Sequence, residues 1–181
     1  IDDDEELAEI ALSHAMYGDN HPYGRDPRGT IDGIDAISVA DITAFYERNI
    51  KCHGGLVGVV GAFDDSVAVD VRQMLQCIDG VPAERIVWPD LPSNTVARTI
   101  FVDKPERSQC HVRIGQPGLQ HMNSEFPAFV LANDCFGVGF QSRLMQEIRV
   151  KSGWSYFAYS SPSLGVADTS WSVGFAPGNE N

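Results

Sequence analysis

Residues 81–97 constrain the fold most, because regular hydrophobic spacing stops there and does not resume until about residue 99. The stretch contains three prolines, Pro82, Pro89 and Pro92. Proline fixes its own φ angle and lacks a backbone donor, so neither a helix nor a central strand crosses such a stretch readily. We therefore expect this stretch to be a linker or a domain boundary between a first and a second part of the chain. A chain of 181 residues is long enough for one large domain or for pieces of two smaller ones.

Charge and composition exclude several classes of protein. The formal net charge is −12 and the apolar fraction is 43%, which is typical of a globular protein and argues against binding to nucleic acid. No apolar run approaches the roughly 18 residues that a membrane span requires. The four cysteines are widely spaced and form no C-x-x-C pair, which favours small buried apolar residues over a zinc ribbon or a disulfide framework.

The first part has the signals of three helices and one strand. Acidic residues followed by apolar residues at helical spacing predict a helix over 4–17, ended by Gly18. An irregular loop follows at 21–30. Ser38 has the residue type of an N-cap for a helix ending near Asn49. The apolar run 56–61 predicts a buried strand, and a further helix begins at Asp64 and closes at Gly80.

The second part predicts strands and helices in alternation. Strands are expected at 99–103 and 110–115, then a helix over 126–136 with Pro127 in its first turn, where proline is tolerated. A glycine-rich turn leads to a second helix, capped by Ser142 and running to about Lys151. Two final strands are expected at 154–161 and 169–175. The whole pattern predicts an α+β fold with antiparallel or mixed sheets and helices packed on one face.

Few residues carry a clear chemical signal by spacing alone. No two of the five histidines stand at the H-x-x-H or H-x-x-x-H spacing that places two imidazoles on one helix face, so no metal ligand is assigned. The glycines at 137–139 lack the features of a dinucleotide or phosphate loop. Arg149, at a helix end, and Tyr156, on the next strand, can come together across a helix–turn–strand unit. Residue types alone also allow a capping cation and an interface aromatic.

Four segments in order resemble one family. Ser142–Tyr156 matches S-R-L-x-x-E-[IL]-R-x-x-x-G-[LW]-x-Y, preceded by the glycine turn Gly137-Val138-Gly139. Tyr17–Gly24 ends in H-P-Y-G and is followed by Gly29-Thr30, and Gly58–Asp64 matches a V-V-G-D-F-D turn with Ala62 in place of its acid. These segments resemble the pitrilysin/insulinase-type zinc peptidases, the inverted zincins, in their bacterial two-domain form.

The resemblance implies a fold and a missing metal site. The chain would hold the end of one metallopeptidase (LuxS/processing-peptidase-like) domain at 1–83, a linker at 84–98 and the start of a related second domain at 99–181. The family's zinc is held by an H-x-x-E-H helix and a distal Glu. The chain has no H-x-x-E-H, so zinc is expected in the parent protein and not on this chain alone. Glu5, Glu6 and Glu9 lie near the expected distal Glu, and a solvated acidic helix face is the alternative for them.

The resemblance also implies roles for specific residues. Tyr156 would donate its hydroxyl to the oxyanion of the tetrahedral intermediate, Arg149 would bind the substrate carbonyl, and Gly137 and Gly139 would contact substrate. The expected partners are peptide substrates and either the rest of the parent chain or a homologous subunit. A periplasmic or cytoplasmic bacterial location is favoured. The chain alone should be inactive and should associate through exposed strand edges. The alternative function is a non-catalytic partner or structural subunit.

Overall fold

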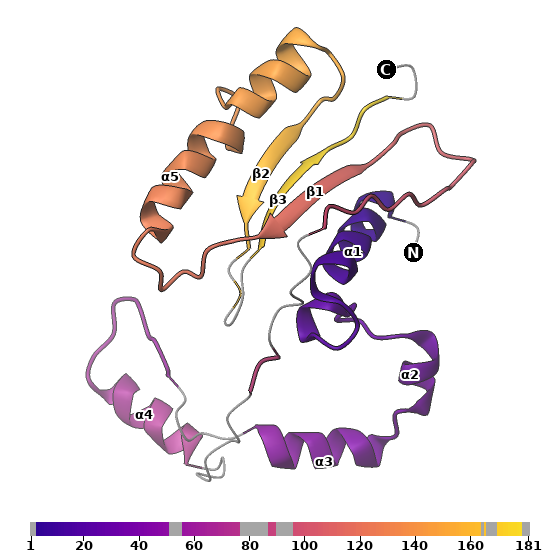
Figure 1. The fold of residues 1–181 in the computed structure, drawn as a ribbon. Coiled ribbons are helices and arrows are strands. Elements are labelled where there is room, and N and C mark those ends of the chain that lie inside the picture. Colours follow the sequence, from indigo (N-terminus) through magenta and orange to yellow (C-terminus); the bar gives the residue numbers. More distant parts are fainter. Residues whose placement is uncertain are drawn as a thin grey trace. The chain divides into compact units, whose positions relative to one another are not determined.

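A computed structural model describes residues 3–50, 56–76, 87–89, 96–163, 165 and 170–178. It confirms a mixed α+β fold with a small antiparallel sheet and helices (Figure 1). The chain forms two compact units, one of Ile1–Pro27 with Trp88–Asn181 and one of Arg28–Val87. Most of the expected linker at 84–98, like the expected helix end at Gly80, lies outside the described residues. No helix in the described ranges is both long and apolar enough to cross a membrane.

The sheet of the first unit has three strands in the order β1-β3-β2. They are β1 (Val112–Pro117), β2 (Ala158–Pro162) and β3 (Ser170–Phe175), and both neighbours run antiparallel to β3. The small core beside the sheet includes Ala158, Val173 and Ala176. The strands expected at 110–115 and 169–175 are therefore present with small shifts. The strand expected over 154–161 begins only at Ala158.

Two helices connect β1 to β2. Helix α5 (Phe126–Gly137) has Pro127 in its first turn, as predicted, and lies against β2 (Figure 1). The segment η2 (Met145–Lys151) occupies the position of the second predicted helix but is a π-helix. Its wider hydrogen-bonding continues past its end, where the Ser152 backbone N–H donates to the Glu147 carbonyl at 3.1 Å. Ser142 precedes the helical residues 143–144 that lead into η2, and its Oγ accepts from the Met145 N–H at 3.4 Å.

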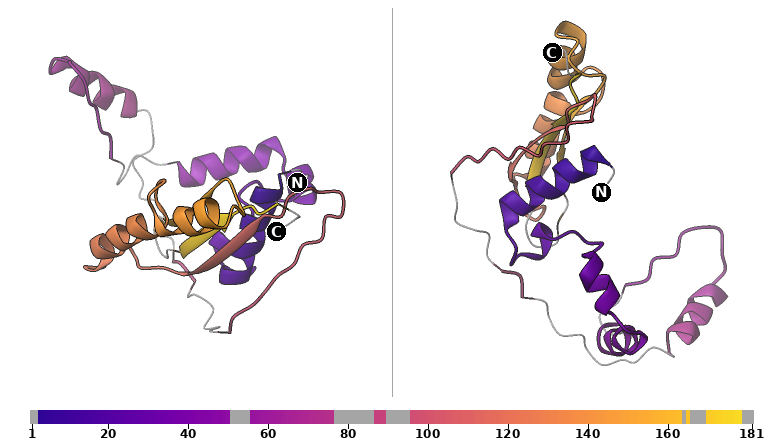
Figure 2. Two further views of the ribbon diagram at one scale, coloured as in Figure 1. Left: turned by 90° about the horizontal axis from the view of Figure 1, so that it is seen from above. Right: turned by 90° about the vertical axis from the view of Figure 1, so that its right-hand side faces the viewer.

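Helix α1 (Asp4–Tyr17) belongs to the same unit and lies along β1 (Figures 1 and 2). Its start is fixed by the Asp3 carboxylate, which accepts from the N–H groups of Glu5 and Glu6 at 2.9 and 3.1 Å. Gly18 ends the helix with a positive φ of 72°, as the sequence predicted. The N-terminal segment is therefore packed against a strand that lies about a hundred residues away in sequence.

An aromatic cluster follows α1. The short 3-10 helix η1 (Pro22–Gly24) begins after His21, which is 1% exposed. The His21 ring stacks on Tyr17 with centroids 5.1 Å apart, and Tyr23 and Trp88 complete the cluster. His21 and Gly24 of the H-P-Y-G segment are thus buried, and Trp88 of the linker region packs on the His21 and Tyr23 rings.

The second unit consists of helices without a buried core among its described residues. They are α2 (Ile31–Ala36), α3 (Val39–Asn49) and α4 (Ser66–Leu75), and none of them contains a buried residue. The predicted cap at Ser38 is confirmed and forms a capping box with Asp41. Apolar side chains on α3, including Ile42 and Phe45, remain exposed.

Two predicted strands were wrong. Residues 56–61 and 99–103 are not in a β-strand, and Leu56 and Phe101 are 97% and 83% exposed. Both segments have the apolar, β-branched composition of strands. A strand also requires a neighbour that pairs with its backbone groups, and no described residue pairs with either segment. The composition of these segments indicates a tendency to form strands, but it does not show whether another strand is available to pair with them.

Gly137 tests the packing of α5 on the sheet. A methyl group at this position would overlap the Ser160 side chain and lie 2.5 Å from the Ser160 backbone nitrogen. Because backbone cannot move aside easily, we expect Gly137→Ala to lower the free energy of unfolding by about 2 kcal/mol or more. Gly178→Ala is the matched control, since nothing lies within 4 Å of its Cβ position. Denaturant unfolding measures both, and equal stability of the two variants would contradict the packing.

Candidate functional site

The predicted pair Arg149 and Tyr156 lies on either side of the turn between η2 and β2. Arg149 is in the last turn of η2, and its carbonyl accepts from the N–H groups of Ser152 and Gly153. The Trp154 N–H donates to the Ile148 carbonyl at 3.0 Å, and Gly153 adopts a φ of 67°. These backbone bonds fix the reversal of the chain that brings the helix end and the strand entry into one turn.

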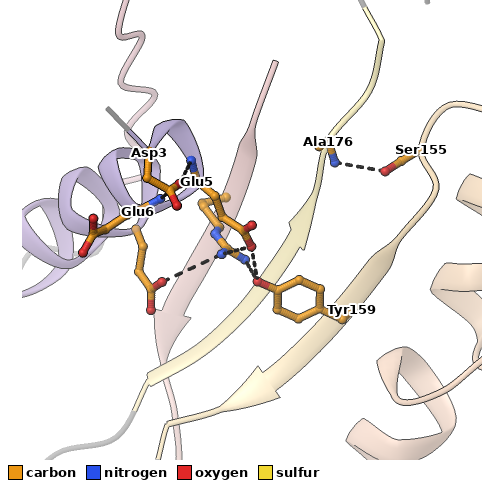
Figure 3. A network of polar contacts seen from close by, with 8 residues as sticks. Asp3, Glu5, Glu6, Ser155, Tyr159 and Ala176 are labelled. Carbon is orange, nitrogen blue, oxygen red and sulfur yellow. Dashed lines mark hydrogen bonds and ion pairs between the residues drawn. The ribbon is translucent and has the colours of Figure 1, made fainter. Parts of the chain in front are cut away.

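Tyr156 is positioned by the residue before it. Ser155 is buried, and its Oγ accepts from the Ala176 N–H at 3.1 Å and from the Phe157 N–H at 3.3 Å. The same hydroxyl donates to the Phe157 carbonyl at 2.6 Å (Figure 3 shows the bond to Ala176). Ser155 therefore ties the strand entry to the end of β3. The Tyr156 side chain projects outward and is 84% exposed.

The structure gives the two predicted residues different surroundings. The Arg149 guanidinium carbon lies 5.2 Å from the centre of the Phe140 ring, a cation–π contact from the turn before η2. Within the described residues, no contact joins Arg149 to Tyr156. Of the predicted glycines, Gly137 packs against β2, and Gly139 occupies the turn after α5 with a φ of 77°.

A second polar cluster lies between α1 and the sheet, and the sequence did not reveal it. The Arg113 guanidinium, 8% exposed, binds Glu5 at 2.8 Å and lies 3.8 Å from Glu9 (Figure 3). The Tyr159 hydroxyl donates to the same Glu5 oxygen at 3.0 Å and accepts a hydrogen bond from Arg113. The cluster thus joins α1 to β1 and β2 through one arginine.

The register of the sheet explains how this cluster forms. Arg113 and Tyr159 are both opposite Gly174, one on each side of β3. Because Gly174 has no side chain, the arginine reaches across the central strand and lies 5.0 Å from the centre of the Tyr159 ring. A Cβ on Gly174 would lie 3.0 Å from the Tyr159 ring. The sequence shows a glycine at 174 within a predicted strand. Only the register of the sheet shows that Arg113 and Tyr159 lie on either side of it.

Burial and charge shift two titrating groups in this region. Burial raises the pKa of the Tyr159 phenol above its usual value, and the hydrogen bond from Arg113 partly opposes this shift. The hydrogen bond from Lys104 lowers the pKa of Asp4, with Arg107 adding an attractive charge. Both shifts keep each group in the form its partners require: Tyr159 protonated as a donor and Asp4 ionised as an acceptor.

The described residues do not fit a zinc ion. They contain no group of three or more His, Cys, Asp or Glu side chains that could hold a metal. Asp4 is paired with Lys104 at 2.5 Å, and Glu5 is shared between Arg113 and Tyr159. His14 Nδ1 lies 3.2 Å from Asp19 Oδ1 at the exposed end of α1, and this is the ion pair of His14 within the described residues.

The family of the chain follows from comparison with known sequences. The family model described as the peptidase M16 inactive domain matches residues 36–181. The chain belongs to this family, in agreement with the resemblance found in the sequence. The matched range includes the turn that carries Arg149 and Tyr156.

Relatives and solved structures agree with this assignment. The chain is 32% identical over 172 residues to an uncharacterized zinc protease of Streptomyces coelicolor, covering 92% of this chain and 37% of that protein. It is 30% identical over 169 residues to one of Mycobacterium leprae, covering 88% and 36%. It therefore spans little more than a third of the length of these relatives.

The fold is similar to two solved structures. The peptidase M16 inactive domain from Pseudomonas fluorescens superposes with a TM-score of 0.84 at 26% identity, covering 98% of this chain and 43% of that one. A protease from Helicobacter pylori gives a TM-score of 0.80 at 19% identity, covering 94% and 42%. The second likeness concerns the fold alone.

The α1–sheet cluster predicts unequal effects for two glutamates. Glu5→Gln should lower the free energy of unfolding by about 1–3 kcal/mol, because it removes the charge that compensates a nearly buried arginine. Glu9→Gln should cost less than about 0.5 kcal/mol, since Glu9 is 69% exposed and 3.8 Å away. Chemical denaturation of both variants measures the difference. Equal losses would mean that Arg113 does not rely on Glu5.

Proposed function

We propose that this chain is part of a zinc-dependent endopeptidase that cleaves peptides enclosed between two related domains, and that it lacks the metal site but supplies Arg149 and Tyr156 to the substrate and transition state. Membership of the M16 inactive-domain family and the zinc-protease names of its relatives support the proposal. The observation that carries it is the exposed Tyr156 side chain, held at the start of β2 by the buried Ser155. Such a phenol is available to a ligand and fixed at its base.

Tyr156 would stabilise charge that develops during peptide hydrolysis. Attack on a peptide carbonyl produces a tetrahedral oxyanion, and a hydrogen-bond donor aimed at that oxygen lowers the barrier. The phenol O–H of Tyr156 is such a donor, and a fixed backbone reduces the reorganisation needed to present it. Its role would be to donate to the oxyanion and leave the bond-breaking chemistry to other groups.

Arg149 would bind the substrate backbone beside Tyr156. Its planar guanidinium offers several donors to carbonyl oxygens, and its stacking on Phe140 holds the side chain at the helix end. The two residues lie on either side of one short turn, which would fix the spacing of their Cα atoms while their side chains contact substrate. The turn that begins at Gly137 and includes Gly139 would line the adjacent path of the peptide.

The remaining parts of the enzyme would come from outside this chain. The described residues do not fit zinc, so the metal would be held by the rest of the parent protein or by a homologous subunit. The zinc-protease names of the relatives support such a metal in the family. Peptides are the expected substrates.

A second candidate is a purely structural or partner subunit of the same family. The family description as an inactive domain favours it, as does the engagement of Arg149 with Phe140 rather than with Tyr156. A structural subunit would have no need for an exposed phenol at a fixed position. The effect of removing that hydroxyl therefore separates the two functions.

Tyr156→Phe tests the proposal within the intact peptidase assembly. We expect kcat for peptide cleavage to fall about 10²–10³-fold, the usual effect of losing one oxyanion donor. KM and thermal stability should change little, because the side chain is 84% exposed.

Tyr46→Phe serves as the matched control. Tyr46 is an exposed tyrosine on α3, in the other unit, and its loss should leave cleavage unchanged. If Tyr156→Phe cleaves peptides as fast as this control, Tyr156 has no catalytic role and the structural alternative is favoured.

A further inference from the structure

A cavity that is largely open to solvent lies beside α5, and neither Arg149 nor Tyr156 lines it. Its volume is about 450 Å³, within the range of small-ligand sites. One wall is formed by the face of α5 that presents Phe129, Ala132 and Phe136, spaced three and four residues apart. Trp171, from the start of β3, and Arg143 also line the cavity.

The position of Trp171 in this cavity is fixed by contacts with α5. The Trp171 indole N–H donates to the Asn133 side-chain oxygen at 2.7 Å, and its ring lies 5.5 Å from that of Phe136. The buried Asn133 oxygen also accepts from Ser160 Oγ at 2.7 Å. Both acceptor sites of the amide oxygen are therefore used within the protein. The amide fixes Trp171 and leaves ligand recognition to other groups.

Arg143 is the charged residue among those that line the cavity. Within the described ranges, its guanidinium makes no hydrogen bond, ion pair or cation–π contact, and the residue is exposed. Arg113 and Arg149, by contrast, are engaged by Glu5 and Phe140. An unpaired guanidinium beside an apolar cavity complements a ligand that combines an apolar group with a carboxylate.

We propose that this cavity binds the C-terminal residue of a peptide, with its apolar side chain against the aromatic rings of α5 and Trp171 and its α-carboxylate on Arg143. A C-terminal apolar residue is the peptide unit that carries both groups on one Cα atom, which suits a cavity of this size. The inference rests on the proposed function in taking peptides as the ligands. Hydrolysis of a peptide bond also generates such a terminus on one product.

Two small probes that differ only in charge test the carboxylate. N-acetyl-L-phenylalanine carries the carboxylate, and N-acetyl-L-phenylalaninamide replaces it with a neutral amide. In calorimetric titration of the 181-residue chain, the acid should bind at least about ten-fold more tightly than the amide, as expected for a charge-assisted bidentate contact. Equal affinity for the two probes, or binding of neither at millimolar concentration, would overturn the proposal.

Arg143→Gln should abolish this preference, so that both probes bind equally weakly. Arg72→Gln makes the same charge change on α4, in the other unit, and should retain the preference. Ala132→Phe should block binding of both probes by filling the cavity, with the circular dichroism spectrum and melting temperature unchanged because Ala132 is exposed. Retention of the acid preference in Arg143→Gln would refute the role of Arg143.

These measurements involve no hydrolysis, so they are independent of the catalytic proposal. A chain that prefers the acid while Tyr156→Phe leaves cleavage intact would keep the cavity as a peptide-terminus site and exclude the oxyanion role. The reverse pair of results would assign the cavity to packing against the rest of the parent protein and leave the oxyanion role in place.

Discussion

Strand β3 holds the first unit together, because it hydrogen-bonds to both β1 and β2 and supplies the contacts on which the candidate sites depend. At its end, the Ala176 N–H fixes Ser155 and so the position of Tyr156. At its start, Trp171 lines the cavity. In the middle, Gly174 leaves the space through which Arg113 reaches Tyr159. One strand thus positions three separate features.

The association of α1 with the sheet depends on a balance of charge. Arg113 is nearly buried, and a buried cation requires a compensating partner. Glu5 supplies it, and Tyr159 completes the hydrogen bonds of the shared oxygen (Figure 3). Further along the same helix, Leu12 and Met16 lie next to Gly115 of β1. Polar and apolar contacts therefore hold together two segments that the proline-bearing stretch separates in the sequence.

Local signals in the sequence predicted the helices well. Asp3 and Gly18 bound α1, Ser38 starts α3, and Pro127 lies in the first turn of α5, because each of these effects acts within a few residues. The strands at 56–61 and 99–103 were wrong, because pairing depends on a partner elsewhere. The contact of Glu5 with Arg113 spans 108 residues, and no spacing in the sequence could indicate it. The π-helical form of η2 also gave no signal.

The candidate site divides in the same way. Arg149 and Tyr156 came from a family motif, and the structure places them on either side of the turn between η2 and β2. The residues that support them, Ser155 and Phe140, carry no signal in the sequence because their roles depend on contacts with β3 and η2. Arg143 lies within the same motif, yet its isolation beside an apolar cavity is a property of the fold. The sequence motif thus indicates the candidate residues, and the fold determines which side chains contact them.

The central claim is that this chain is part of a metallopeptidase whose metal is held outside the chain. Zinc titration of the metal-free 181-residue chain, followed by a peptide-cleavage assay of the same sample, tests it most directly. The account predicts no stoichiometric zinc binding and no cleavage that a chelator abolishes. Binding of one zinc ion per chain together with chelator-sensitive cleavage would contradict it.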